Sequence, residues 1–113
     1  MTNYEMILRN KGVEDNGARH VWSFMELFAV VENPYAILKE DVRNRVSEML
    51  ECDKDDFYIL PSSIYEVLCI RKKATPVELL GIVRDMNENE VAEKDQFTTD
   101  VFMVVDGEIV SAV

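Results

Sequence analysis

Residues 57–86 read FYILPSSIYEVLCIRKKATPVELLGIVRDM and decide the fold, because two short apolar runs stand before the clearest helix start in the chain. Residues 57–60 and 67–70 have the length and composition of buried strands. Pro61 ends the first run, since proline has no N–H to donate to a strand ladder. The two serines that follow it form a turn or bulge. The stretch therefore predicts two neighbouring strands followed by a helix.

Two segments predict helices. Thr75 is placed to cap a helix N-terminus, with Pro76 at the first helical position and Glu78 completing a capping box. We expect this helix to end near Asn87, with Asn87 as its C-cap. Residues 40–51 carry apolar side chains at i, i+4, i+7 and i+8 and acids in the first turn, a pattern typical of an amphipathic helix.

The N-terminal third of the chain has weaker signals. Residues 4–9 predict a first strand, and residues 10–17 form a polar, glycine-containing loop. Residues 18–31 fit both a helical stripe and a nearly continuous apolar strand. The aromatic and β-branched content of this segment, and the stop at residues 32–35 before the apolar residues 36–38, favour a hairpin.

A hairpin is also predicted at the C-terminal end. Residues 101–105 and 109–113 are apolar, and Asp106-Gly107 between them is typical of a type I′ turn. The order of strands and helices predicts an α+β fold in which residues 1–113 form a single domain. We expect a largely antiparallel sheet with two helices packed on one face.

Composition limits the classes of function. The chain of 113 residues has 12 basic and 22 acidic side chains, a net charge of −10 and a pI near 4.5. This charge repels phosphate backbones and anionic lipids, so direct binding to nucleic acid or membrane is not expected. No run approaches the roughly 18–20 apolar residues of a membrane span, and the start lacks the features of a secretory signal. Cys52 and Cys69 form no CxxC motif, and reduced thiols are expected in a cytoplasmic protein.

Metal ligands and catalytic groups are poorly spaced. His20 is the single histidine and is distant in sequence from both cysteines, so we expect no metal site and a surface or strand-edge position beside Trp22. Residues 53–56 lack the glycine and the final glutamate of a calcium loop and are expected to be a solvated turn. Burial of Cys69 and the acids around Cys52 disfavour thiolates. Phosphate-cradling glycine motifs are missing too, so the sequence predicts no cofactor and no catalytic residue.

Acidic residues gather in the C-terminal part of the chain. From Asp85 to Glu108, eight acids accompany one base, Lys94, which gives a net −7 of the total −10. The simplest explanation is a solvated face that keeps a small protein soluble. The functional alternative is an electrostatic surface for a basic partner. The binding candidates in this segment are Glu88, Glu90 and Glu93.

The turn at residues 62–66 is the second candidate site. Its two serine hydroxyls can bond neighbouring backbone groups, so a structural role is favoured over a ligand site. The binding candidates in this turn are Ser62, Ser63, Tyr65 and Glu66.

A resemblance to a known family is carried by the same turn. Residues 58–67, YILPSSIYEV, are similar to an Ile-Leu-Pro-Ser-Ser-Ile-His-Glu-Val run in a family of uncharacterised domains known mainly from intestinal clostridial bacteria. Residues 83–91 resemble the Val-Asn-x-x-x-Val segment that follows in that family. The resemblance covers residues 28–105 and implies bacterial kinship without an established activity. Tyr65 stands where the family pattern has His, which weakens an enzymatic interpretation.

Three hypotheses of function follow. The leading one is a small, acidic, non-enzymatic protein-interaction module with a protein partner that carries basic charge. The alternative is a phage or mobile-element inhibitor whose acidic surface imitates nucleic-acid phosphates. The second alternative is a small hydrolase or transferase that uses Ser62, Ser63 or Glu66, and convergence of these three in a concave pocket would favour it. The oligomeric state is left open.

Overall fold

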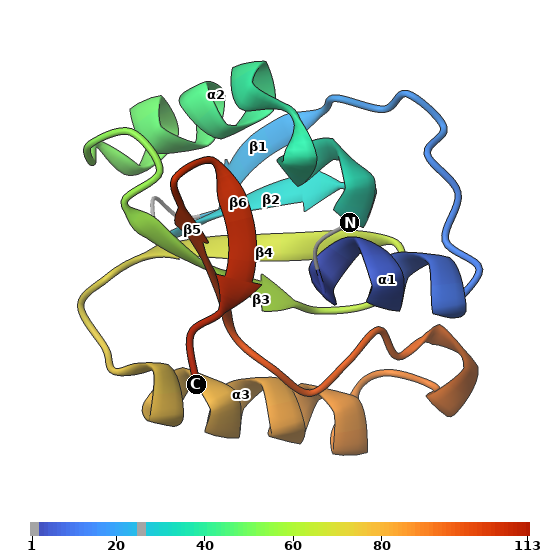
Figure 1. The fold of residues 1–113 in the computed structure, drawn as a ribbon. Coiled ribbons are helices and arrows are strands. Elements are labelled where there is room, and N and C mark those ends of the chain that lie inside the picture. The colour runs from blue at the N-terminus through green and yellow to red at the C-terminus, as the bar shows by residue number, and fades with distance from the viewer. Residues whose placement is uncertain (1–2, 25–26) are drawn as a thin grey trace.

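Within residues 3–24 and 27–113, which the computed structural model describes, six strands form one antiparallel sheet (Figure 1). The order across the sheet is β1-β2-β4-β3-β5-β6, so β1 and β6 are its edges. The strands are β1 (Val21–Phe24), β2 (Phe28–Glu32), β3 (Phe57–Pro61), β4 (Glu66–Arg71), β5 (Phe102–Val105) and β6 (Glu108–Ser111).

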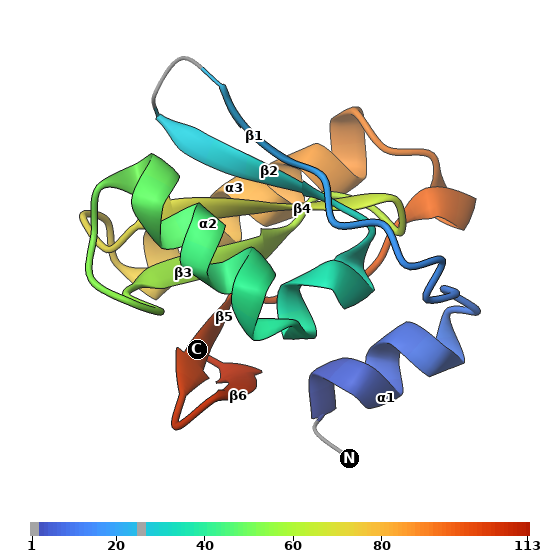
Figure 2. The ribbon, with the colours of Figure 1, turned by 90° about the horizontal axis from the view of Figure 1, so that it is seen from above.

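Helices cover both faces of this sheet. Figures 1 and 2 show α2 over one face and α3 over the other. In the same described part of the chain the helices are α1 (Asn3–Asn10), α2 (Glu40–Leu50), α3 (Pro76–Asn89) and the short 3-10 helices η1 (Pro34–Leu38) and η2 (Glu93–Asp95). The α+β class and the antiparallel sheet are thus confirmed. Two helices share one face, but they are α1 and α2, because α3 packs on the opposite side.

Strand alternation divides the core into two layers. In β3, Phe57 and Ile59 face the layer that contains α1 and α2, while Tyr58 and Leu60 face α3. The first layer is the larger and includes the buried residues Tyr4, Leu8, Ile37, Val42, Val46, Cys69, Phe97, Phe102 and Ile109. The second layer is built on Leu60, Leu79, Val83 and Val101. Burial on both faces explains why β3 and β4 are nearly continuous apolar runs.

The strand predicted at residues 4–9 is wrong, because this segment is the helix α1. Tyr4 and Leu8 are fully buried four residues apart, which is the spacing of one helix face and not of a strand. The hydroxyl of Tyr4 donates a hydrogen bond of 2.7 Å to the carbonyl of Pro34, which attaches α1 to η1. The short apolar run was an ambiguous signal, and tertiary packing selects the helical period.

The hairpin predicted from residues 18–38 is present in a different place. β1 pairs with β2, so both strands lie within residues 18–32, and residues 25 and 26 of the predicted segment lie outside the described residues. The returning strand predicted at residues 36–38 is wrong, because these residues belong to η1. Asn33 has a φ of 66° and its side chain accepts a hydrogen bond from the N–H of Tyr35, so the proline between them starts a 3-10 turn.

The two longer helices confirm their sequence signals. α2 begins at Glu40, and the capping box of α3 is complete: the N–H of Glu78 donates to Thr75 Oγ1 (3.3 Å) and the N–H of Thr75 to Glu78 Oε2 (3.1 Å). α3 continues to Asn89, so Asn87 as a C-cap is wrong. Its side chain is buried and bonds to the backbone and side chain of residues 98–99.

The predicted strands in the second half of the chain are confirmed. β3 and β4 cover residues 57–60 and 67–70, and they pair directly. Asp106 and Gly107 have φ values of 50° and 79°, the positive values that a type I′ turn requires, and they join β5 to β6.

Candidate functional site

The turn between β3 and β4 is held by its own serine hydroxyls. Ser62 Oγ donates to the carbonyl of Glu66 (2.9 Å), and Ser63 Oγ accepts from the N–H of Tyr65 (3.1 Å). Ser62 is 9% exposed. Both hydroxyls therefore stabilise the backbone of the turn, which is the structural role that the sequence predicts. The hydroxyl of Ser62 donates to a carbonyl oxygen and not to a base.

Tyr65 connects this turn to η2. Its side chain is 61% exposed, and its hydroxyl donates to Asp95 Oδ1 at 3.0 Å. The N–H of Ile64 donates to the carbonyl of Asp95 at 2.9 Å. The pKa of Tyr65 is raised, mainly because its hydroxyl donates a hydrogen bond to the Asp95 carboxylate. The negative charge of that carboxylate raises the pKa further. The contact fixes an exposed aromatic ring between two segments that lie 30 residues apart in the sequence.

The structure brings the predicted turn and one of the three acidic candidates, Glu90, to one hollow of about 380 Å³. Turn residues form one side, and the end of α3, the residues that follow it and the last residue of η2 form the other. We name it the Tyr65 hollow; its lining is Ser62, Ser63, Tyr65, Glu66, Leu68, Met86, Glu90, Val91, Ala92 and Asp95. Convergence of Ser62, Ser63 and Glu66 is thus present, but the hollow contains no histidine.

Glu88 and Glu93 line a second hollow of about 500 Å³. We name it the Asn87 hollow; its lining is Arg84, Asn87, Glu88, Glu93, Gln96 and Thr99. The three acidic candidates are therefore divided: Glu90 faces the turn, and the other two do not.

Carboxylates around Tyr65 lack basic partners. Glu66 is directly opposite Glu32 in the β2–β4 register, and like charges opposite each other destabilise a strand pair. Among residues 3–24 and 27–113, no Lys, Arg or His nitrogen lies within 4.0 Å of the carboxylates of Glu32, Glu66 or Glu90. This arrangement attracts positive charge or hydrogen-bond donors from outside the chain.

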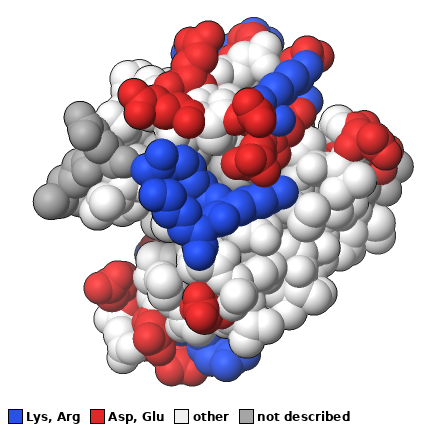
Figure 3. Space-filling model, turned by 90° about the vertical axis from the view of Figure 1, so that its left-hand side faces the viewer, with Lys and Arg blue, Asp and Glu red and all other residues white. Residues whose placement is uncertain are grey.

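The acidic segment from Asp85 to Glu108 is not one continuous surface. Asp106 and Glu108 belong to the β5–β6 turn, which lies far from the C-terminal end of α3 in both ribbon views (Figures 1 and 2). Basic side chains gather on the side shown in Figure 3, where β4 ends and the chain continues to α3. Residues 71–73 there are Arg-Lys-Lys, and Lys72 Nζ lies 3.6 Å from Asp56 Oδ1. A basic group therefore lies just before the start of α3, which itself carries Glu78 in its first turn.

Groups with metal-binding or nucleophilic chemistry are isolated. In the described part of the chain, no three His, Cys, Asp or Glu side chains are arranged to hold a metal ion. His20 lies against Trp22, with ring centroids 5.0 Å apart, as the sequence predicts. Burial raises the pKa of Cys52 and, more strongly, that of Cys69, so both thiols are poor nucleophiles.

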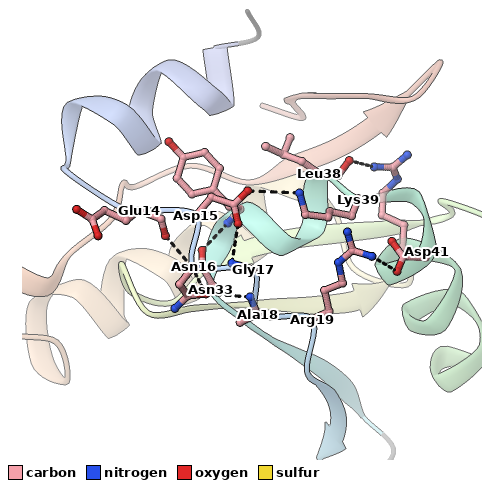
Figure 4. Close-up of polar contacts among 12 residues, drawn as sticks. Glu14, Asp15, Asn16, Gly17, Ala18, Arg19, Asn33, Leu38, Lys39 and Asp41 are labelled. Carbon is pink, nitrogen blue, oxygen red and sulfur yellow. Dashed lines mark hydrogen bonds and ion pairs between the residues drawn. The ribbon is translucent and has the colours of Figure 1, made fainter.

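Asn33 is a positioning residue that the sequence analysis did not identify. Its Nδ2 donates to the carbonyl of Glu14 (2.8 Å) and to Asn16 Oδ1 (2.9 Å), and its N–H donates to the carbonyl of Tyr65 (2.7 Å). Figure 4 shows how the loop around Asp15 is held by Asn33 and by Lys39. The Asn-Pro dipeptide indicated a turn, but only the fold places Asn33 beneath Tyr65.

Residues 34–104 match the model of a family of unknown function (DUF5688). The match covers more than half of the chain, and the protein therefore belongs to this family. The matched range contains both hollows. No curated protein and no solved structure matches the chain significantly. No helix in residues 3–24 and 27–113 is long and apolar enough to cross a membrane.

Proposed function

We propose that this protein is a non-enzymatic interaction module that binds a basic segment of a partner protein in the Tyr65 hollow. The observation that carries the proposal is the convergence of Tyr65 with Glu66 and Glu90, two carboxylates without a basic partner in the described structure. An exposed tyrosine supplies contact area at low entropic cost, and tyrosine is enriched at protein interfaces. Lysine and arginine side chains of a partner complement the surrounding charge.

Electrostatic steering supports the same partner chemistry. The net charge of −10 repels acidic partners, while the acids near the hollow attract basic ones and accelerate encounter. The free thiols Cys52 and Cys69 support a reducing compartment, so the proposal includes a cytoplasmic location, in agreement with the bacterial kinship inferred from the sequence.

Selection from a random 12-residue peptide library tests the proposal. We expect enrichment of peptides rich in Lys and Arg, with binding that weakens as salt is added. Tyr65→Ala and the double variant Glu66→Gln with Glu90→Gln should lose the selected peptides. The matched control is Asp106→Asn with Glu108→Gln, which removes the same charge from the distant β5–β6 turn. Enrichment without basic residues, or equal binding by all variants, contradicts the proposal.

The nucleic-acid-mimicking inhibitor remains a prediction with a different signature. Such an inhibitor binds the basic site of a nucleic-acid enzyme and competes with DNA or RNA, and many acids share the binding energy. The control variant at Asp106 and Glu108 would then weaken binding as much as the variant at the hollow. The convergence of Ser62, Ser63 and Glu66 in one hollow favours the hydrolase alternative, but the hydroxyl of Ser62 donates to a carbonyl oxygen and not to a base.

A further inference from the structure

The edge strand β1 directs backbone hydrogen-bonding groups away from the sheet. β2 pairs with one side of β1, and within the described residues no strand pairs with the other side (Figure 2). The N–H of Glu32 donates to the carbonyl of His20 (3.1 Å), so these two residues form a hydrogen-bonded pair of the β1–β2 ladder. Hydrogen-bonded and non-bonded pairs alternate along an antiparallel ladder. The N–H and C=O groups of Val21 and Ser23 therefore point away from β2.

This edge is open to another strand. Proline, bulges, charged side chains and covering helices are the devices that protect sheet edges. Residues 21–23 are Val-Trp-Ser, without charge or proline, and they pair with β2 in an unbroken register. Arg19, just before the strand, is held by Asp41 of α2, with Nη1 2.9 Å from Oδ2. The opposite edge differs, because α1 lies beside β6 (Figures 1 and 2).

Charge near this edge selects the kind of segment that can add to it. Val31 of β2 belongs to the first core layer, so the next residue, Glu32, faces the other side of the sheet. By the strand register Glu32 lies between His20 of β1 and Glu66 of β4, in one row across the strands. Neighbouring strands are about 4.8 Å apart, so a Lys or Arg on an added strand beside His20 can reach Glu32. Glu66 also lines the Tyr65 hollow, and the row therefore connects the edge to that hollow.

Trp22 offers an apolar contact next to this row. Its side chain is half-buried and lies on the same face as His20, with ring centroids 5.0 Å apart. Aromatic and β-branched side chains pair favourably across neighbouring strands. A segment with an apolar residue two positions from a basic one places the first beside Trp22 and the second beside His20, because side chains two residues apart share a face.

We propose that β1 binds an extended segment of the partner as a seventh strand of the sheet, with a basic residue beside His20 and an apolar residue beside Trp22. Main-chain hydrogen bonds supply affinity in this mode of recognition, and alternate side chains supply specificity. The inference rests on the proposed function and adds the conformation in which the basic segment binds. The net charge of −10 opposes pairing of two copies along their β1 edges, so the occupant is the partner.

Hydrogen exchange of single amides tests the inference. The full chain, labelled with ¹⁵N, is mixed with a short synthetic peptide in which Lys and Val alternate on one face and Thr fills the other. We expect the N–H groups of Val21 and Ser23 to exchange more slowly by about tenfold or more when the peptide is bound. A matched peptide with Glu in place of Lys should bind about tenfold more weakly.

Loss of single backbone donors separates a strand ladder from a side-chain contact. N-methylation along the Lys peptide should weaken binding about tenfold at every second residue and by less than about twofold between, because alternate N–H groups point at β1. Ser23→Pro removes an outward N–H, which an edge strand tolerates, and should weaken the peptide about tenfold. The control Ser23→Ala keeps that N–H and should change binding by less than about twofold. The N-methyl scan uses the unchanged chain, so it decides the question even where Ser23→Pro disturbs folding.

The remaining outcomes overturn the inference or the proposed function separately. Unchanged exchange at Val21 and Ser23 removes the strand site and leaves the proposed function intact. Uniform effects along the N-methyl scan refute the strand ladder, and equal binding of the Glu peptide refutes recognition of charge. Slower exchange that grows with the concentration of the protein alone identifies a second copy as the occupant. Protection by the Lys peptide, together with a library selection that yields no basic peptides, would refute the proposed function and not the strand site.

Discussion

The ion pair between Arg43 and Asp55 gives a prediction whose magnitude follows from the structure. Arg43 is 5% exposed; its Nε donates to Asp55 Oδ1 (3.0 Å), and one terminal nitrogen donates to the carbonyls of Ile37 (3.2 Å) and Leu38 (2.8 Å). Removing one partner of a buried pair costs about 3–5 kcal/mol. The Asp55 side chain is 18% exposed and the two carbonyls still hold the guanidinium, so we expect Asp55→Asn to lower the free energy of unfolding by about 2 kcal/mol.

Asparagine is the informative replacement because Asp55 has a φ of 60°, a conformation that Asn also tolerates. Urea unfolding followed by circular dichroism should show a midpoint lower by about 1 M. Asp53→Asn in the same loop is the control and should change the free energy by less than about 0.5 kcal/mol. The double variant Arg43→Met with Asp55→Asn should lose less than the sum of its two single changes. Equal midpoints for the variants at Asp55 and Asp53 would refute the reasoning.

Two further predictions concern single hydrogen bonds. Thr75→Ala removes the side chain that accepts from the N–H of Glu78 and should cost about 1 kcal/mol in the same urea experiment; an unchanged midpoint would show that this cap does not stabilise α3. Asp95→Asn should lower the pKa of Tyr65 towards its ordinary value, because the carboxylate that favours the protonated phenol is gone. The ring signals of Tyr65 in a pH titration measure this, and an unchanged curve contradicts the contact with Asp95.

Signals confined to a few neighbouring residues predicted structure well. The Thr75 capping box and the Asp106-Gly107 turn depend on backbone geometry within four residues, and both are formed as expected. The amphipathic period of α2 was equally clear, because its buried positions recur on one face over three turns.

Short apolar runs carried less information. In α1 the run of three apolar residues after Glu5 fits a strand as well as a helix, and the packing of Tyr4 under Pro34 decides between them. Residues 36–38 are apolar because η1 lies against the core, not because they form a strand. Such segments take their conformation from distant contacts that a local pattern does not contain.

The candidate site was predicted as two separate pieces. The Pro-Ser-Ser sequence indicated the turn, and the number of acids indicated the acidic segment. The hydrogen bond from Tyr65 to Asp95 joins the turn to the acidic segment across 30 residues of sequence. No rule of residue spacing predicts such a contact. Asn87 was predicted as a C-cap, since an asparagine near a helix end indicates a cap far more often than a buried side chain within the helix.

The charge pattern of the site has a cost to folding. Opposing Glu32 to Glu66 destabilises the β2–β4 pair, and an unsatisfied Asn87 Oδ1 adds a second cost nearby. Some acids of the first half are neutralised: Asp41 pairs with Arg19, and others pair with Lys39, Arg43 and Lys54. Glu32, Glu66 and Glu90 have no such partner within the described residues. Natural proteins retain such local costs where function offsets them, and under our proposal a basic segment bound in the Tyr65 hollow offsets the repulsion between Glu32 and Glu66.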